Sequence, residues 1–150
     1  MTKVKIVYAS MTGNDEEMAD LLCENFEQAG MDVDVSEISQ TDAADYQTAD
    51  LCVLVSYTYS DGDEGNIPDE GLDFYHDLAE TDLTGKIFGV CGSGDTFYQD
   101  FAVAVDHFAT VFQRAGAIKG ATSVKVELAP QSKDVANLNQ FARTLIQHFK

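Results

Sequence analysis

Three short segments hold the groups that could do chemistry, and the first directly follows an apolar run at residues 3–9. It reads Ser-Met-Thr-Gly-Asn-Asp and leads into a charged stretch with helical character. The first amides of a helix lie unpaired at the positive end of its dipole, so this loop could bind a phosphate without a cationic side chain. The candidate ligands are Ser10, Met11, Thr12, Gly13, Asn14 and Asp15. The alternative is a polar turn, with Asn14 capping the helix and Glu17 completing a capping box.

Other phosphate-binding motifs fit the sequence less well. The Walker motif requires a Gly-Lys pair, and no Lys or Arg occurs between Lys5 and Lys86. The run at residues 91–97 has two of the three glycines of the dinucleotide motif, with Phe97 in the place of the third. The sequence therefore favours a single phosphate, as on a mononucleotide.

The charge of the chain limits its partners. The formal net charge is −17, and most of the 26 acidic residues but none of the nine Lys and Arg lie between Ile6 and Gly85. Nucleic acids and anionic membranes attract clustered cations, so both are excluded as partners. A basic protein surface would complement the acidic half, although such charge can also serve solubility alone.

Length and composition indicate one domain over residues 1–150, since 45% apolar residues are enough for a core. No export signal or membrane-length apolar run is apparent, so we expect a cytoplasmic protein. The three cysteines, Cys23, Cys52 and Cys91, have neither metal-binding nor Cys-x-x-Cys spacing. We therefore expect reduced thiols and no metal site.

The candidate segments follow strand-like runs that alternate with helical ones. This alternation predicts an α/β fold with a parallel sheet. The first, third and fourth runs are almost continuously apolar, as in central strands, whereas the second and fifth alternate with polar residues, as at edges. With right-handed crossovers, this pattern predicts a five-stranded sheet of order 2-1-3-4-5 with helices on both faces. The runs cover residues 3–9, 31–38, 51–57, 86–91 and 123–128.

Apolar residues at helical spacing mark the elements between the strands. Gly30 and Gly116 are placed to end two of these helices, and Pro68 with Asp69 begins a further helix. The apolar stripes are Met18, Leu21, Leu22 and Phe26; Leu72, Phe74 and Leu78; Phe101, Val105, Phe108 and Phe112; and Leu138, Phe141, Ala142, Leu145 and Phe149.

The three loops together resemble those of the flavodoxins, which are small FMN-containing electron carriers. Residues 10–14 look like their phosphate loop, and "YTYSDG" at 57–62 and "CGSGDTFY" at 91–98 look like their two flavin loops. The predicted strand order is that of flavodoxin itself. The fifth strand leads into the last helix without a long insertion, which is similar to the short-chain branch. The resemblance covers essentially the whole chain and implies a flavodoxin-like three-layer sandwich.

The resemblance implies that the protein binds FMN non-covalently and carries single electrons at low potential between soluble redox enzymes. Tyr59 and Tyr98 should flank the flavin ring, with Phe97 as the alternative to Tyr98. The further implied FMN ligands are Tyr57, Thr58, Ser60, Asp61, Gly62, Cys91, Gly92, Ser93, Gly94 and Asp95. Basic reductases and acceptors would bind the acidic protein transiently, and it would be a monomer.

Two positions depart from the family pattern. Asp15 stands where Ser or Thr is usual, which removes a phosphate donor and adds a like charge. Its carboxylate must turn away from the phosphate, be screened, or weaken FMN binding. Ser60 stands where Gly is common, in a loop that is a few residues longer than usual.

Two rival functions remain open at this point. The same fold could carry an FMN-dependent quinone or nitro reductase, which would need a substrate pocket over the flavin. A non-flavin interaction module, such as a receiver domain, would instead need clustered acids after the first strand and a Lys after the fifth. Ala9-Ser10 and Ala129-Pro130 occupy those places.

Overall fold

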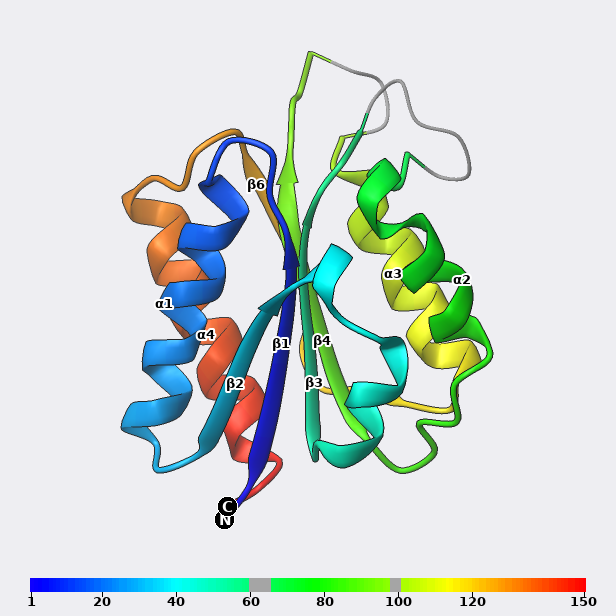
Figure 1. The fold of residues 1–150 in the computed structure, drawn as a ribbon. Helices are drawn as coiled ribbons and strands as arrows, with labels where there is room; N and C mark the ends of the chain where they lie inside the picture. Colours follow the sequence, from blue (N-terminus) through cyan, green and yellow to red (C-terminus); the bar gives the residue numbers. More distant parts are fainter. Residues whose placement is uncertain (60–65, 98–100) are drawn as a thin grey trace.

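A single twisted sheet divides the protein into three layers. The computed structural model describes residues 1–59, 66–97 and 101–150, and Figure 1 shows helices packed against both faces of the sheet. All strand pairs are parallel. The strands are β1 (Lys3–Ala9), β2 (Asp32–Glu37), β3 (Leu51–Tyr57), β4 (Ile87–Gly94), β5 (Ile118–Lys119) and β6 (Val124–Glu127).

The predicted strand order is confirmed, because the sheet runs β2-β1-β3-β4-β5 and β6 also pairs with β4. β3 is buried at every position but its last, whereas no residue of β2 is fully buried. The apolar content of each run thus reports whether one or both faces of the strand are covered.

The fifth strand position differs from the prediction. One strand is predicted at residues 123–128, but β5 and β6 share this edge and are separated by residues 120–123. Ile118 pairs with Ile87 at one end of β4, and Val124 pairs with Cys91 further along it. The two-residue β5 carries no readable alternation, so the sequence pattern shows only the longer β6.

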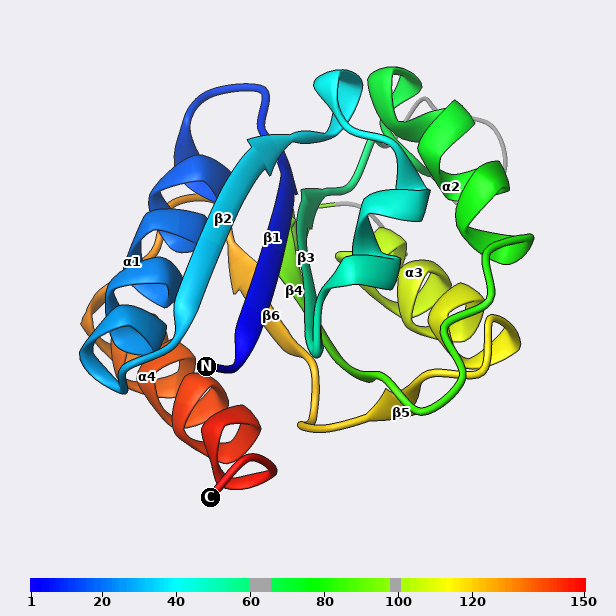
Figure 2. The same cartoon turned by 60° about the horizontal axis from the view of Figure 1, so that its bottom comes forward.

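Within the described residues, two α-helices cover each face of the sheet. α1 (Asn14–Gln28) and α4 (Ser132–Gln147) lie on one face, and α2 (Leu72–Ala79) and α3 (Val103–Arg114) lie on the other (Figure 1). The short 3-10 helix η2 (Ala43–Thr48) packs on the α2 and α3 side (Figure 2). Gly30 and Gly116 follow the ends of α1 and α3 as predicted.

The predicted helix stripes form the two cores. Met18, Leu22 and Phe26 of α1 pack on one face of the sheet with α4, and Phe108 and Phe112 of α3 pack on the other. Several predicted positions lie outside the helices. Phe101 precedes α3, and Phe149 follows the end of α4. Pro68 and Asp69 begin the 3-10 helix η3 (Asp69–Gly71), which leads into α2.

Ring contacts fix the core beneath α3. The ring of Phe112 stacks on Phe88 of β4 with centroids 4.7 Å apart and packs against Tyr46 at 5.3 Å. The buried Tyr46 hydroxyl donates to the Val53 carbonyl over 2.7 Å, which satisfies its only donor. In the described part of the chain, no helix is long and apolar enough to cross a membrane.

Candidate functional site

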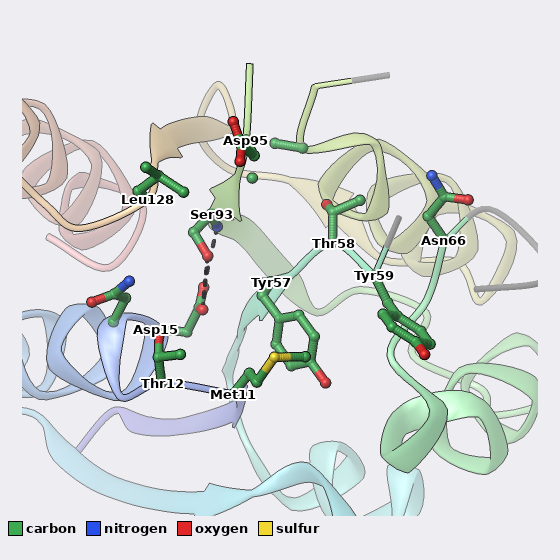
Figure 3. A pocket seen from close by; sticks show the side chains of 13 residues that line it. Met11, Thr12, Asp15, Tyr57, Thr58, Tyr59, Asn66, Ser93, Asp95 and Leu128 are labelled. Atoms are coloured by element: carbon green, nitrogen blue, oxygen red, sulfur yellow. Dashed lines mark hydrogen bonds between the residues drawn. The ribbon is translucent and has the colours of Figure 1, made fainter. Parts of the chain in front are cut away.

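A pocket of about 250 Å³ lies at the carboxyl ends of β1, β3 and β4, where the three predicted loops meet (Figure 3). This is the place where open α/β sheets bind ligands. Ten of the predicted residues line it: Met11, Thr12, Asn14, Asp15, Tyr57, Thr58, Tyr59, Ser93, Gly94 and Asp95.

The first wall of the pocket is the loop between β1 and α1. Gly13 is the N-cap residue of α1 and has a φ of 92°, a left-handed conformation that favours glycine. The alternative turn with Asn14 as the cap is therefore wrong, because Asn14 is already the first helical residue. A glycine cap has no side chain to accept from the first-turn amides, so the amides other than that of Asp15, which bonds its own carboxylate, are left for a ligand. The Ser10 Oγ accepts from the Gly13 amide over 2.9 Å and shapes the loop.

Asp15 lies in the first turn of α1, and its carboxylate points across the pocket floor to β4. Oδ1 accepts from the Ser93 amide over 3.1 Å, and Oδ2 accepts from the Ser93 hydroxyl over 2.8 Å (Figure 3). The residue is only 2% exposed. Burial raises its pKa to about 6, although the two bonds from Ser93 act in the opposite direction. In the structure the Asp15 carboxylate is thus hydrogen-bonded to Ser93 of β4, and its effect on FMN binding stays a prediction.

Two tyrosines form the opposite wall. The Tyr57 hydroxyl donates to the Glu70 carboxylate over 2.8 Å, and burial together with this bond raises the pKa of Tyr57. The Tyr59 amide donates to the Asn66 carbonyl over 2.8 Å, which joins the two ends of the longer loop. An aromatic wall suits a planar ligand, since aromatic side chains favour stacked contacts.

The end of β3 is tied to both β4 and α3. The Thr58 amide donates to the Ser93 carbonyl over 3.1 Å, and the Thr58 hydroxyl accepts from the Ala104 amide over 3.2 Å. Thr58 therefore caps α3, whose own N-cap residue, Ala102, offers no polar side chain. Gly92 allows β3 and β4 to approach, because a Cβ there would lie 1.9 Å from the Ser56 carbonyl oxygen.

The pocket is also lined by three residues that the sequence patterns do not predict: Asn66, Ala102 and Leu128. These are the non-glycine residues with positive φ in the described chain, at 62°, 49° and 56°. Asn tolerates this conformation, whereas Ala and Leu pay roughly 1–2 kcal/mol for it. Backbone strain of this kind gathers at functional sites. Only Asn66, in a polar loop, carries a sequence signal that could have identified it.

The remaining predicted ligands lie elsewhere. Ser10 and Gly13 shape the first loop without lining the pocket, and Cys91 and Gly92 are buried in β4. Phe97 is 85% exposed and also does not line the pocket. The other predicted positions, Ser60, Asp61, Gly62 and Tyr98, lie outside the described residues.

Cys52 and Cys91 are buried, Cys23 is partly buried, and all three thiols are free. Burial raises the pKa of Cys52 to about 12. Over the described ranges 1–59, 66–97 and 101–150, no three His, Cys, Asp or Glu side chains come together as metal ligands.

Comparison with known proteins identifies the kind of site. The sequence matches the flavodoxin family over residues 6–138. The chain belongs to the flavodoxin family. It is 39% identical to probable flavodoxin 2 of Bacillus subtilis over 144 residues, which cover 95% of this chain and 93% of the relative.

Solved flavodoxins share the whole fold. The flavodoxin of Streptococcus pneumoniae TIGR4 superposes with a TM-score of 0.94 at 49% identity, covering 98% of this chain and 99% of its own. A short-chain flavodoxin associated with a PDU bacterial microcompartment superposes with a TM-score of 0.93 at 50% identity over the full length of both chains. The predicted short-chain type is therefore confirmed.

Flavodoxins are electron-transfer flavoproteins that bind FMN and exchange electrons with redox partner proteins. The protein is accordingly an FMN-binding electron carrier, and the alternative of a quinone or nitro reductase is not favoured. The residues present fit FMN, because an uncapped helix N-terminus adjoins an aromatic wall in one pocket. Among the described residues that line the pocket, Asp15 is the acidic one at that helix end.

Proposed function

We propose that FMN binds with its phosphate at the N-terminus of α1 and its flavin ring against the wall formed by Tyr57 and Tyr59. The observation that supports this orientation is that Asn14 and Asp15, at the N-terminus of α1, line the same pocket as both tyrosines, while the cap residue of this helix is a glycine. When bound, FMN supplies the one-electron redox chemistry.

The phosphate end is assembled from backbone amides and two hydroxyl or amide side chains. The first-turn amides of α1 have no intrahelical acceptor and lie at the positive end of the helix dipole. Thr12 is exposed on the loop and Asn14 opens the helix, so both line the pocket next to these amides. Such donors bind a phosphate without the cations that this half of the sequence lacks.

The ring end is assembled from aromatic and apolar side chains. Tyr59 would stack on the flavin, and Tyr57 is held in place by its bond to Glu70. Met11 and Leu128 line the same pocket and are 64% and 53% exposed, so they remain available to cover a ring edge. A hollow of about 250 Å³ encloses only part of an FMN-sized ligand, which leaves an edge accessible to a partner.

We expect a low reduction potential for bound FMN because of the charge around the pocket. Asp95 contributes a carboxylate, Asp15 adds a second one while it is ionised, and no Lys, Arg or His belongs to the described lining. Added negative charge on the reduced cofactor is therefore disfavoured, which lowers the potential. We also propose, from the family resemblance, that Tyr98 or alternatively Phe97 flanks the flavin ring together with Tyr59.

The partners we propose are redox proteins with basic surfaces, which bind this protein transiently. We further propose that the protein is a single-domain monomer and acts in the cytoplasm. The acidic residues concentrated between Ile6 and Gly85 support such partners. Electron transfer would occur while the exposed ring edge faces the partner.

Titration of the apoprotein with FMN and with riboflavin, followed by flavin fluorescence, tests the phosphate site. FMN should bind at least tenfold more tightly, since only FMN places a charged acceptor on the α1 amides. Thr12→Val should weaken FMN but not riboflavin. The matched control Thr110→Val removes a hydroxyl that donates to the Asp106 backbone carbonyl within α3, and it should change neither affinity. Equal affinities for the two flavins would refute the proposed orientation.

Potentiometric reduction of the FMN-loaded protein tests the carrier function. Two separated one-electron steps are expected, with the second at a lower potential than for free FMN. A quinone or nitro reductase would instead show sustained NAD(P)H oxidation by the purified protein when a quinone or nitro compound is added.

A further inference from the structure

The buried carboxylate of Asp15 lies on the floor of the proposed FMN site, between the helix end that would hold the phosphate and the end of β4. It shares the pocket with Thr12 of the preceding loop and with Asn14, the first residue of α1. An ionised Asp15 and a bound phosphate would thus place two like charges in one pocket, one of them on a buried side chain, which is costly unless one of them is neutralised.

We propose that Asp15 couples proton uptake to FMN binding: the carboxylate takes up a proton from solvent when the phosphate occupies the N-terminus of α1. This inference rests on the proposed function. The reaction adds one proton to one carboxylate oxygen and breaks no other bond. The neutral carboxylic acid no longer repels the phosphate, so the site tolerates an acidic residue in the first turn.

Ser93 allows the contact to persist in both protonation states. With the carboxylate ionised, the Ser93 amide and hydroxyl both donate to it, over 3.1 and 2.8 Å. A hydroxyl is both a donor and an acceptor. After protonation, the Ser93 Oγ can accept from the carboxylic acid while the Ser93 amide still donates to the other oxygen. The link between α1 and β4 is then retained, and only the charge changes.

The neighbouring groups do not neutralise Asp15 in any other way. Tyr57 of β3 and Cys91 of β4 stay neutral near pH 7, because burial raises the pKa of each and Asp15 itself adds to both shifts. The described lining of the pocket contains no Lys, Arg or His. A proton is therefore the available counter-charge.

The other acidic groups near Asp15 are engaged elsewhere or exposed. Glu16 accepts from the Tyr8 hydroxyl of β1 over 2.8 Å, and this bond is the main cause that raises the pKa of Tyr8 to about 12. The Asp95 carboxylate accepts from the Phe97 amide over 2.9 Å. Glu17, in the same helical turn, is exposed. Among these carboxyls, Asp15 is the buried one and burial raises its pKa to about 6, so it is the group poised to protonate.

Isothermal titration calorimetry of the apoprotein with FMN, in buffers of different ionisation enthalpy at pH 7, measures the protons exchanged. The wild type should take up several tenths of a proton to about one proton more per FMN than Asp15→Asn. Comparison with this variant also removes the contribution of the phosphate's own titration. Between pH 6 and 8, the FMN affinity of the wild type should fall relative to that of Asp15→Asn, by up to about tenfold per pH unit.

Three controls make the result specific. Glu17→Gln removes the same charge from the same turn at an exposed position and should exchange protons as the wild type does. Riboflavin has no phosphate and should show no difference between the wild type and Asp15→Asn. Ser93→Ala removes one donor to the carboxylate, so Asp15 should be more protonated before binding and the uptake should be smaller than in the wild type. This variant keeps the test decisive if Asp15→Asn does not fold.

Equal proton exchange by the wild type and Asp15→Asn would overturn the inference while leaving FMN binding intact. If the wild type and Asp15→Asn differed in proton uptake by the same amount when they bind riboflavin, the inference would also be overturned, because the phosphate would then not be the cause. Failure of the wild type to bind FMN would overturn the proposed function and this inference together.

Discussion

Replacement of Asp15 by Asn should stabilise the apoprotein at neutral pH, even though it removes a residue that makes two hydrogen bonds. Asn keeps the shape of Asp, its oxygen can still accept from the Ser93 amide, and its amide group can donate to the Ser93 hydroxyl. The substitution deletes the charge that is costly to bury.

The magnitude follows from the shift in pKa. Burial raises the pKa of Asp15 from 3.8 to about 6. At 1.36 kcal/mol per pKa unit, this shift corresponds to about 3 kcal/mol. The folded state binds more protons than the unfolded state between these two values. The stability contributed by Asp15 is therefore fully present below pH 4 and is lost as the pH rises through 6.

Asp15→Asn avoids this loss because Asn does not titrate. The apoprotein of the variant should be more stable than the wild type by up to about 3 kcal/mol at pH 7, and the difference should vanish near pH 4. Urea unfolding followed by circular dichroism at half-unit steps from pH 4 to 8 measures the difference. Glu17→Gln, which alters an exposed carboxylate in the same turn, is the control and should show no comparable pH dependence.

A variant no more stable than the wild type at pH 7 would refute this reasoning. The bonds from Ser93 would then fully compensate the burial of the charge. A constant stabilisation at every pH would equally contradict it, since titration of Asp15 could not be the cause.

Three further outcomes are expected. Gly92→Ala should lower the free energy of unfolding by at least about 2–3 kcal/mol, because the new Cβ would lie only 1.9 Å from the Ser56 carbonyl oxygen. Urea unfolding measures this loss, and an unchanged unfolding midpoint would contradict the prediction. Thr58→Val should lower the free energy of unfolding by about 1 kcal/mol, because it leaves the Ala104 amide at the start of α3 without its acceptor. Amide hydrogen exchange at the start of α3 should become faster. Exchange as slow as in the wild type would show that the cap is unimportant. Electron transfer to a basic acceptor should slow as salt rises toward 0.15 M, where the Debye length is about 8 Å; a stopped-flow rate insensitive to salt would leave the acidic half without a docking role.

Local patterns in the sequence determined most of the fold. The nearly continuous apolar runs at β1, β3 and β4 predicted central strands, and the alternation at β2 predicted an edge. The helix stripes predicted which residues fill the two cores. These features depend on the periodicity of apolar residues, which is 2.0 residues in strands and 3.6 in helices. This periodicity can be read from one segment of the sequence without knowing what packs against it.

The meeting of the three loops was also predictable, because the carboxyl ends of neighbouring parallel strands lie at one edge of the sheet. Ten predicted residues line the pocket for this reason. The split of the edge strand into β5 and β6 was not predictable, because a two-residue strand shows no periodicity.

Only the tertiary structure decided what the side chains at this edge contact. Asp15 and Ser93 are 78 positions apart in the sequence, and Thr58 and Ala104 are 46 apart. Ala102 and Leu128 hold positive φ values that neither residue type favours. Such contacts and strained conformations are imposed by packing between distant elements, and packing leaves no local pattern in the sequence. The sequence therefore predicted which loops meet in the pocket, and the fold decided that the pocket includes a buried carboxylate.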